Sequence, residues 1–189
     1  HKGTPKARTV PPKETAMKLI YTASQVREAE KPYIEAADYD GYLMQRAADA
    51  VAAEAQDLLH GKENAKILLL IGPGNNGADT IYAGARLSAK GHRVDAVIFD
   101  PSEKNLELIA REGGEGTRVL DPEHTLEHLT GYDLTIDGIL GTGSSGAVRG
   151  SAGEYLGVLR AAQLDGKLGA VLAVDTPSGV DNNLSLIHI

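Results

Sequence analysis

The chain of 189 residues contains no cysteine. This absence excludes a disulfide framework, a thiolate zinc site and a cysteine nucleophile. Basic residues are also in the minority, since 19 Lys and Arg against 26 Asp and Glu give a formal net charge of -7. That balance argues against nucleic acid as a partner, because binding to phosphates requires a basic face. The 6 histidines are not spaced as metal ligands, so we interpret most of them as solvated loop residues.

Long apolar runs are missing as well. No stretch approaches the ~20 residues that a helix needs to cross a bilayer, so we expect no membrane segment and a cytoplasmic location. Hydrophobic residues at 42% and charged residues at 24% are ordinary for a globular protein. A chain of 189 residues suits one domain with a sizeable core, either an enzyme or a binding domain.

The two ends differ from the middle. Residues 1–16 are basic, contain proline and show no apolar periodicity, so we expect a disordered or non-native extension. Residues 184–189 read Leu-Ser-Leu-Ile-His-Ile, which a transposase adapter used in sequencing libraries encodes in one reading frame. We therefore expect an incomplete domain over residues 17–183 followed by adapter translation, with a genuine short hydrophobic tail as the alternative.

Between the ends, helix and strand patterns alternate. Continuous apolar strands such as 67–71 indicate burial on both faces of a sheet and hence parallel strands. The fold class that follows is a three-layer α/β/α Rossmann-like sandwich with a mostly parallel sheet. We expect strands at 65–71, 93–99, 117–120, 134–137 and 170–174, and helices at 24–36 (capped by Ser24), 42–59, 78–89, 103–112, 125–129 and 153–164.

A glycine turn follows the first strand. Gly72, Gly74 and Gly77 satisfy G-x-G-x-x-G, which after a strand and before a helix indicates the phosphate turn of a dinucleotide-binding unit. We expect glycine there because it tolerates positive φ and lets a ligand approach the backbone. The free N–H groups at the start of the next helix attract anions.

Polar side chains accompany this turn. Asn75, Asn76 and Asp79 are either ligand-binding groups or, alternatively, turn formers and a helix-dipole acid. An acid here would repel a pyrophosphate, which argues against a plain NAD dehydrogenase. Asp100 follows the second strand and is either a ribose-binding acid or the start of an Asp-Pro turn.

Two more motifs end the fourth and fifth strands, at residues 137–143 and 174–179, and parallel topology places all three at one edge. Asp137 at a buried strand end needs a partner. A cation with Asn76 and Ser178 as neutral oxygen ligands would supply one, and hydrogen bonds from loop N–H groups are the alternative. Asp175 is an acid/base, a substrate-hydroxyl acceptor or a turn cap, and we expect burial to favour its protonated form.

The segments GPGNNGAD, DGILGTGSSGAVRG and VDTPSGVD together resemble the YjeF N-terminal family, the NAD(P)H-hydrate epimerases, over residues 21–181. The resemblance implies an isomerase that interconverts the R and S forms of hydrated NADH and NADPH (NAD(P)HX) in cofactor repair. It implies K+ as cofactor and an NAD(P)HX dehydratase as partner, in trans or fused in a bifunctional enzyme, and it allows a homodimer.

The resemblance also implies roles for particular residues. Asp175 is our candidate for the acid/base group at C6 of the hydrated ring, and Asn76, Asp137 and Ser178 match the potassium ligands. The residues that match the substrate-binding segments are Asn75, Asn76, Gly77, Ala78, Asp79, Gly141, Thr142, Gly143, Ser144, Ser145, Gly146, Ala147 and Asp175.

The chain departs from the family pattern at a few positions. Ala78 and Thr80 stand where glycine is usual, and Ser144 and Thr176 replace apolar residues. We expect the Ala78 methyl to lie near the ligand and Thr80 to face solvent. Two other functions are considered: a non-catalytic nucleotide- or RNA-linked binding module of the same fold, and an NAD-dependent dehydrogenase, for which no room remains.

Overall fold

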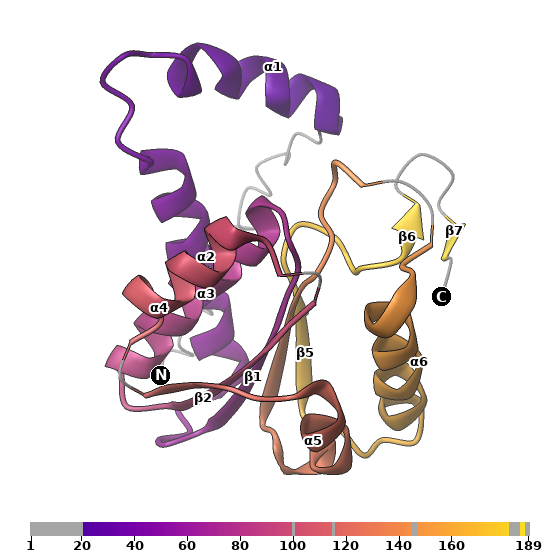
Figure 1. The fold of residues 1–189 in the computed structure, drawn as a ribbon. Helices are drawn as coiled ribbons and strands as arrows, with labels where there is room; N and C mark the ends of the chain where they lie inside the picture. Colours follow the sequence, from indigo (N-terminus) through magenta and orange to yellow (C-terminus); the bar gives the residue numbers. More distant parts are fainter. Residues whose placement is uncertain (1–20, 100, 115, 145–146, 182–185, 188–189) are drawn as a thin grey trace, which may run out of the picture.

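A five-stranded sheet carries helices on both faces (Figure 1). The computed structural model describes residues 21–99, 101–114, 116–144, 147–181 and 186–187. The expectations for residues 1–16 and for most of 184–189 therefore lie outside the described residues. In chain order the elements are α1 (Ala23–Ile34), α2 (Tyr42–Leu58), β1 (Lys66–Ile71), α3 (Asn75–Ala89), β2 (Arg93–Ile98), α4 (Glu103–Glu112), β3 (Thr117–Val119), α5 (Pro122–Glu127), the 3-10 turn η1 (Leu129–Gly131), β4 (Leu134–Gly138), α6 (Gly150–Leu164), β5 (Ala170–Ala173), β6 (Val180–Asp181) and β7 (Leu186–Ile187).

All strands of this sheet are parallel, in the order β3-β2-β1-β4-β5. β1 is central, and its last residue Ile71 lies beside Ile98 of β2 and Gly138 of β4. Three neighbouring strands thus end at one level, which gathers the loops that follow them. The predicted α/β sandwich with a parallel sheet is confirmed; β6 and β7 form a separate antiparallel pair.

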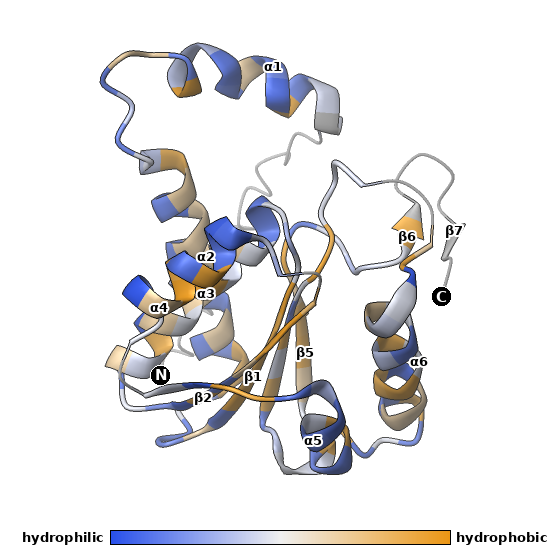
Figure 2. Cartoon of the chain, viewed as in Figure 1, coloured by the Kyte–Doolittle hydropathy of each residue, from blue (hydrophilic) through white to orange (hydrophobic). Residues whose placement is uncertain are grey.

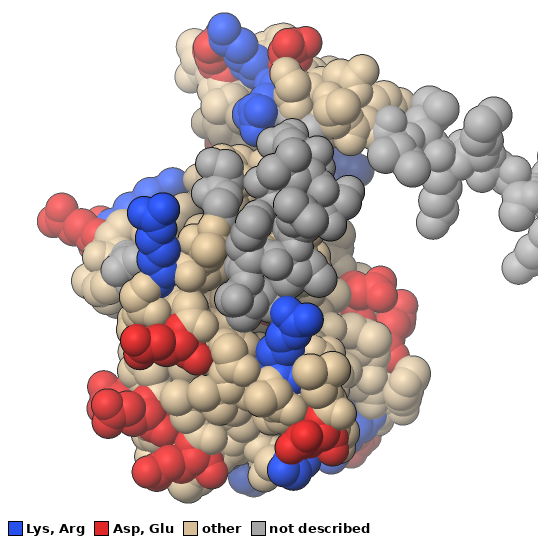
Figure 3. Space-filling view, turned by 90° about the vertical axis from the view of Figure 1, so that its right-hand side faces the viewer, with Lys and Arg blue, Asp and Glu red and all other residues tan. Residues whose placement is uncertain are grey.

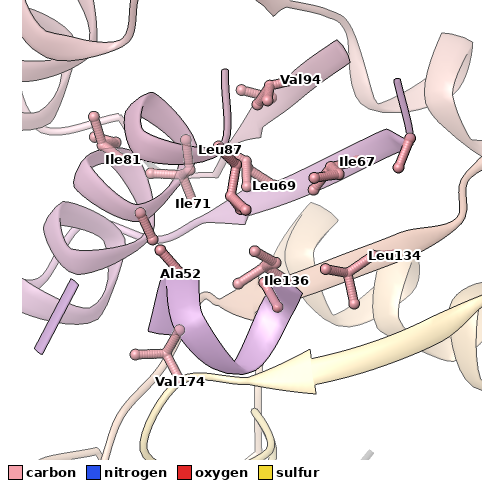
Figure 4. Packing of buried hydrophobic residues seen from close by; sticks show 14 of the residues in the cluster. Ala52, Ile67, Leu69, Ile71, Ile81, Leu87, Val94, Leu134, Ile136 and Val174 are labelled. Atoms are coloured by element: carbon pink, nitrogen blue, oxygen red, sulfur yellow. The ribbon is translucent and has the colours of Figure 1, made fainter. Parts of the chain in front are cut away.

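Alternate residues of β1 face the two helical layers. Ile67, Leu69 and Ile71 pack with α2, α3 and α4, whereas Leu68 and Leu70 pack with α6. Because successive strand side chains point to opposite faces, a sheet covered on both sides requires such an all-apolar strand. Figure 2 shows the apolar strands in the middle of the molecule, and Figure 4 shows the first of these two clusters.

Four helix starts differ from the prediction: α5 and α6 each begin three residues early, at Pro122 and Gly150, and α1 and α3 differ as follows. Thr22, not Ser24, caps α1: its side chain accepts the Gln25 N–H (3.2 Å), and the Gln25 side chain accepts the Thr22 N–H (2.9 Å). This reciprocal capping box satisfies two helix-end donors at once. α3 begins at Asn75, three residues before the predicted start, because Gly74 takes the N-cap position with an extended backbone. The asparagines of the first motif are therefore helical.

β2 carries a buried acid in a polar network. Asp95 is 1% exposed, and its carboxylate accepts hydrogen bonds from Arg118 Nη2 (2.7 Å) on β3 and the Tyr132 hydroxyl (2.8 Å). A buried carboxylate of this kind is tolerated when it is paired and hydrogen-bonded. The network therefore ties the edge strand β3 to the segment that leads into β4.

His92 is an exception to the prediction that most histidines are solvated, since its side chain is buried. Its Nδ1 accepts the N–H of Ala65 (3.2 Å), so Nδ1 carries no proton and the hydrogen sits on Nε2. His92 Nε2 lies 2.6 Å from Gln56 Nε2, a contact that becomes a hydrogen bond when the Gln56 amide is turned so that its oxygen accepts from the ring. Burial, assisted by the charge of Lys90, lowers the pKa of His92 and keeps the ring neutral.

α1 stands away from the sheet above its carboxyl edge (Figure 1), and Tyr33 and Ile34 at its end are 66% and 50% exposed. On the face that Figure 3 shows, acidic and basic side chains of the described residues are interspersed and do not merge into a basic patch. Within the described ranges, every helix is too short or too polar to cross a membrane.

Candidate functional site

The loops after β1, β4 and β5 meet at the carboxyl edge of the sheet, as the topology predicts. Asn76 of α3 joins them, because its Nδ2 donates to the carbonyl oxygens of Val174 (2.8 Å) and Leu140 (3.3 Å). Its side chain is buried, at 8% exposed. One amide thus holds the three sequence motifs against one another.

The glycines of the site let the chain pack against itself. A Cβ on Gly141 would lie 2.3 Å from Asn76 Oδ1, and one on Gly72 would lie 1.9 Å from the Ile139 carbonyl oxygen. None of the three glycines of the turn has a positive φ, so the predicted conformational reason for them is wrong. A Cβ on Gly74 would meet open space, which leaves that stretch of backbone accessible to a ligand.

Asp137, at the end of β4, is a carboxylate that is 5% exposed and forms no ion pair with any described residue. Its Oδ1 accepts from Ser178 Oγ (2.6 Å) and the Ile139 N–H (3.2 Å), and its Oδ2 accepts from the Ser178 N–H (2.8 Å). Burial raises the pKa of Asp137, and these hydrogen bonds oppose the rise. Ser178 Oγ also accepts the N–H of Leu140 (2.9 Å). Asp137 thus accepts hydrogen bonds from loop N–H groups, as the alternative prediction has it. No cationic side chain of the described residues pairs with it.

Asp79 lies one turn into α3 and is 9% exposed, and its Oδ1 has no hydrogen-bond partner among the described residues. Burial, followed by repulsion from Asp175 and Glu30, raises the pKa of Asp79 to about 7, while Lys104 opposes the rise. A carboxyl group with such a pKa exchanges a proton readily near neutral pH, which suits an acid or base in catalysis. The structure therefore places a poised titrating group inside the site.

Asp175 follows β5 and is exposed, so the predicted desolvation of this carboxyl is wrong. Its φ of 64° is left-handed, which is unusual for a residue with a Cβ and is typical of tight turns and functional loops. In this turn the Asp175 side chain lies exposed at the carboxyl edge of the sheet, which we call the rim. The negative charge of Asp175 contributes to the raised pKa of Asp79.

The loop after β4 presents small groups to the rim. Thr142, Gly143 and Ala147 are exposed, while Ser144 is half-buried. Ser144 donates to the Gly141 carbonyl through its N–H (3.0 Å) and its Oγ (2.6 Å), which closes the turn. Three residues with predicted or alternative binding roles lie outside the described residues: Ser145, Gly146 and Asp100.

The two glycine replacements in α3 point inward. Ala78 packs in the core, and its N–H donates to the Gly74 carbonyl (3.2 Å). Thr80 is fully buried, and its Oγ1 donates to the Asn76 carbonyl (2.7 Å). A Cβ on Gly138 would lie 1.8 Å from the Thr80 Oγ1. The expectations that Ala78 faces the ligand and Thr80 faces solvent are wrong, because the earlier helix start turns both residues toward the sheet.

Asn105 of α4 is a site residue that the sequence motifs do not single out. It is fully buried, and its Nδ2 donates to the carbonyls of Gly72 (2.7 Å) and Gly74 (3.4 Å), which fixes the glycine turn. A signal exists in retrospect, since Asn105 shares the buried face of α4 with the apolar Leu108. Polar groups on such faces need partners, and the turn supplies them for Nδ2, whereas the Asn105 Oδ1 has no hydrogen-bond partner among the described residues.

A glycine turn and buried acids at the carboxyl edge of a parallel sheet define a Rossmann-like ligand-binding domain. The crystal structure of the yeast protein YNL200c has this fold, with a TM-score of 0.67, 20% identity, and coverage of 87% of this chain and 74% of that one. The family model described as YjeF-related protein N-terminus matches residues 41–188, and the chain belongs to this family.

Curated relatives carry two names. The bifunctional NAD(P)H-hydrate repair enzyme Nnr of Corynebacterium glutamicum is 34% identical over 87% of this chain and 28% of its own length. The NAD(P)H-hydrate epimerases of Microbacterium testaceum and Clavibacter sepedonicus are 35% and 32% identical, over 85% of this chain and 60% and 69% of their own lengths. The chain thus spans about a third or less of the bifunctional Nnr enzymes of C. glutamicum and Mycobacterium tuberculosis.

Proposed function

We propose that this chain is an isomerase that interconverts the R and S forms of hydrated NADH and NADPH in nicotinamide cofactor repair. The observation that carries the proposal is the buried carboxyl group of Asp79 at the carboxyl edge, whose pKa is raised by burial and by the charge of the exposed Asp175. Membership in the YjeF-related family and relatives named as NAD(P)H-hydrate epimerases support it. Carboxyl groups with strongly raised pKa values cluster at catalytic sites, which favours an enzyme over a binding module.

Inversion at C6 of the hydrated ring requires either that the C6–oxygen bond break and re-form, or that the ring open and close. On both routes one proton is delivered to the departing atom and one is recovered when the bond returns. Asp79, with a pKa of about 7, is suited to hold this proton. Asp175 on the rim is suited to accept a hydrogen bond from the substrate and to take the complementary proton.

The rest of the rim would hold the substrate. The N–H groups at the start of α3 and the open backbone at Gly74 suit its phosphates, because helix N-termini attract anions. A neutral Asp79 removes the repulsion that an ionised acid would exert there. Asn75, which is exposed, and the turn at 141–144 would frame the ring.

We propose in addition that K+ binds between Asn76, Asp137 and Ser178. The three residues offer the oxygen ligands that a hard cation prefers. These are the Asn76 Oδ1, left free when Nδ2 donates to the Val174 carbonyl, the Ser178 hydroxyl, and the buried Asp137 carboxylate, which has no ion pair among the described residues. A cation bound there would neutralise the Asp137 charge and hold the loops together. Asp137 would then have no proton to exchange, which leaves that task to the other two acids.

The acid/base assignment is tested by Asp79→Asn and Asp175→Asn, with Asp165→Asn on the exposed end of α6 as the matched control. Loss of an acid/base group should lower kcat by roughly two to four orders of magnitude, with the fold retained. If Asp175 only contacts the substrate, its variant should raise KM and keep kcat. Epimer exchange at the parent rate in both variants would contradict the assignment.

The cation site is tested by thermal unfolding in potassium chloride and in tetramethylammonium chloride at equal ionic strength. A ligand that binds only the folded state raises the Tm, so potassium should raise it in the parent and not in Asp137→Asn. Equal Tm values of the parent in both salts would contradict the site.

The whole-protein context is also proposed. The length of the bifunctional relatives supports a dehydratase that consumes the S form, either fused or in trans. A cytoplasmic location, a homodimer and the absence of nucleic-acid binding stay predictions. Size-exclusion chromatography with light scattering tests the dimer, and titration with RNA tests the alternative of an RNA-linked module.

A further inference from the structure

Two histidine side chains come together on the surface at α5. His124 lies in the helix and His128 directly after it, and their ring centroids are 4.8 Å apart with the ring planes inclined at 34°. Both side chains are exposed, and neither ring forms a hydrogen bond or ion pair with another described residue. Residues four positions apart lie on one face of a helix. A spacing that did not indicate metal ligands in the sequence therefore brings two imidazole rings together, and we call them the histidine pair.

The backbone that carries the histidine pair is held in place from its buried side, where α5 lies against α6 (Figure 1). Thr125 is fully buried, and its Oγ1 donates to the Pro122 carbonyl (2.8 Å) and lies 2.8 Å from the Tyr155 hydroxyl of α6. Leu129, the residue after the pair, packs in the core that α6 covers. A ligand that bridges the two rings therefore has to order only their side chains, and such preorganisation strengthens binding.

The separation of the two rings suits a single metal ion between them. A metal ion about 2.1 Å from an imidazole nitrogen lies about 3.2 Å from the centroid of that ring. Two centroids 4.8 Å apart then subtend an angle of about 97° at a common ion. This angle lies between the value of about 90° for neighbouring square-planar ligands and that of about 109° for tetrahedral ligands. Rotation of the exposed side chains between rotamers aims one nitrogen of each ring at the ion.

The surroundings of the histidine pair favour a cation. Asp121, Glu123 and Glu127 bring three exposed carboxylates to the same short segment, and none forms an ion pair with a described residue. Asp121 and His124 line one hollow of about 480 Å³, which gives water access to the rings. Among the described residues no third His, Asp or Glu completes a cage around an ion. Water would therefore occupy the remaining coordination positions, and the nearby carboxylates would add attraction through their charge.

Nitrogen ligands determine which cation such a site takes. Imidazole suits zinc, copper and nickel, whereas magnesium and calcium prefer oxygen ligands. We propose that His124 and His128 together bind one divalent transition-metal ion, with water in its other positions. This site differs in kind from the proposed K+ site, where all the ligands are oxygen atoms, and it does not depend on the proposed epimerase activity.

The test uses the full chain without an affinity tag, as the parent and as the single variants His124→Gln and His128→Gln. The matched control is His60→Gln, which removes another exposed histidine, in the turn after α2. Calorimetry measures the binding of nickel chloride, cobalt chloride and magnesium chloride to each protein. Equal urea midpoints in the absence of metal confirm that the variants fold.

We expect His124→Gln and His128→Gln each to bind Ni2+ about tenfold or more weakly than the parent and the control, since even the loss of a group that supports a ligand has an effect of this size. The parent should bind Co2+ more weakly than Ni2+, in the order that nitrogen ligands impose. Equal Ni2+ affinity in the parent and the two variants, or a loss in only one variant, overturns the inference. Equal affinity of the parent for Mg2+ and Ni2+ also overturns it, because the carboxylates alone would then be the ligands.

Discussion

Replacing Asp79 by Asn should change how stability depends on pH. The pKa of Asp79 is raised from 3.8 to about 7 by burial and by repulsion from Asp175 and Glu30. Between pH 4 and pH 7 the folded chain therefore holds a proton that the unfolded chain has released. The free energy of unfolding falls as the pH rises through this window, because an ionised Asp79 is costly to bury. An asparagine has no proton to lose, so its contribution stays constant.

The magnitude follows from the shift. About three pKa units at 1.36 kcal/mol each set a ceiling of about 4 kcal/mol on the loss between pH 4 and pH 8. Water at the rim solvates part of the ionised carboxylate, which brings the expected loss to about 2 kcal/mol. At pH 8 the Asp79→Asn variant should thus exceed the parent by about 2 kcal/mol, and at pH 5 the two should agree within about 0.5 kcal/mol.

Urea unfolding from pH 5 to pH 8.5 measures this difference, with Asp57→Asn on the exposed side of α2 as the control. The control should follow the parent at every pH. Parallel curves for the parent and Asp79→Asn would refute the reasoning, since they would mean that Asp79 is ionised in the folded chain at pH 5. The carboxyl group could then not hold the proton that epimerisation needs.

Three further perturbations probe neighbouring parts of the fold. Gly138→Ala should destabilise the chain by about 3 kcal/mol because its Cβ meets the Thr80 hydroxyl, and Thr80→Gly should restore part of the loss in thermal unfolding. His92 opposes the Asp79 trend: its contribution to the unfolding free energy should fall as the pH drops below about 6.5, since the folded state disfavours the charged ring while the unfolded ring charges. The unfolding free energy of the parent relative to His92→Gln should therefore fall in this range, and a constant difference would contradict the assignment. Tyr132→Phe should cost about 1–2 kcal/mol in urea unfolding by removing a hydrogen bond from buried Asp95, and an unchanged midpoint would show that Arg118 alone satisfies the carboxylate.

The layered fold could be predicted because its signals are local. A strand such as Ile67–Ile71 without a polar residue has few alternatives to burial in a covered parallel sheet, and the regular alternation with helices fixes the rest. The edge at which the motifs meet follows from topology alone. These features need no knowledge of side-chain direction.

The site was harder to predict because its chemistry depends on the directions in which individual side chains point. A shift of three residues in the start of α3 rotates that helix by most of a turn, which sends Thr80 toward the sheet. The left-handed backbone at Asp175 brings its carboxyl group outward, so the burial expected there falls on Asp79. Neither the helix start nor the left-handed backbone can be read from the residue pattern, since each depends on backbone angles that are set by packing elsewhere.

The bridge that Asn76 makes has a consequence for how the chain assembles. Its two hydrogen bonds join residues 64 and 98 positions apart, to Leu140 and Val174. Contacts of such long range form only after the intervening chain has been ordered, so they come late in folding. We expect the loops at the carboxyl edge to close last and, when the native protein fluctuates, to open before the sheet does. Amide hydrogens of these loops should then exchange faster than those of β1, so the site would be assembled and lost as a unit while the sheet persists.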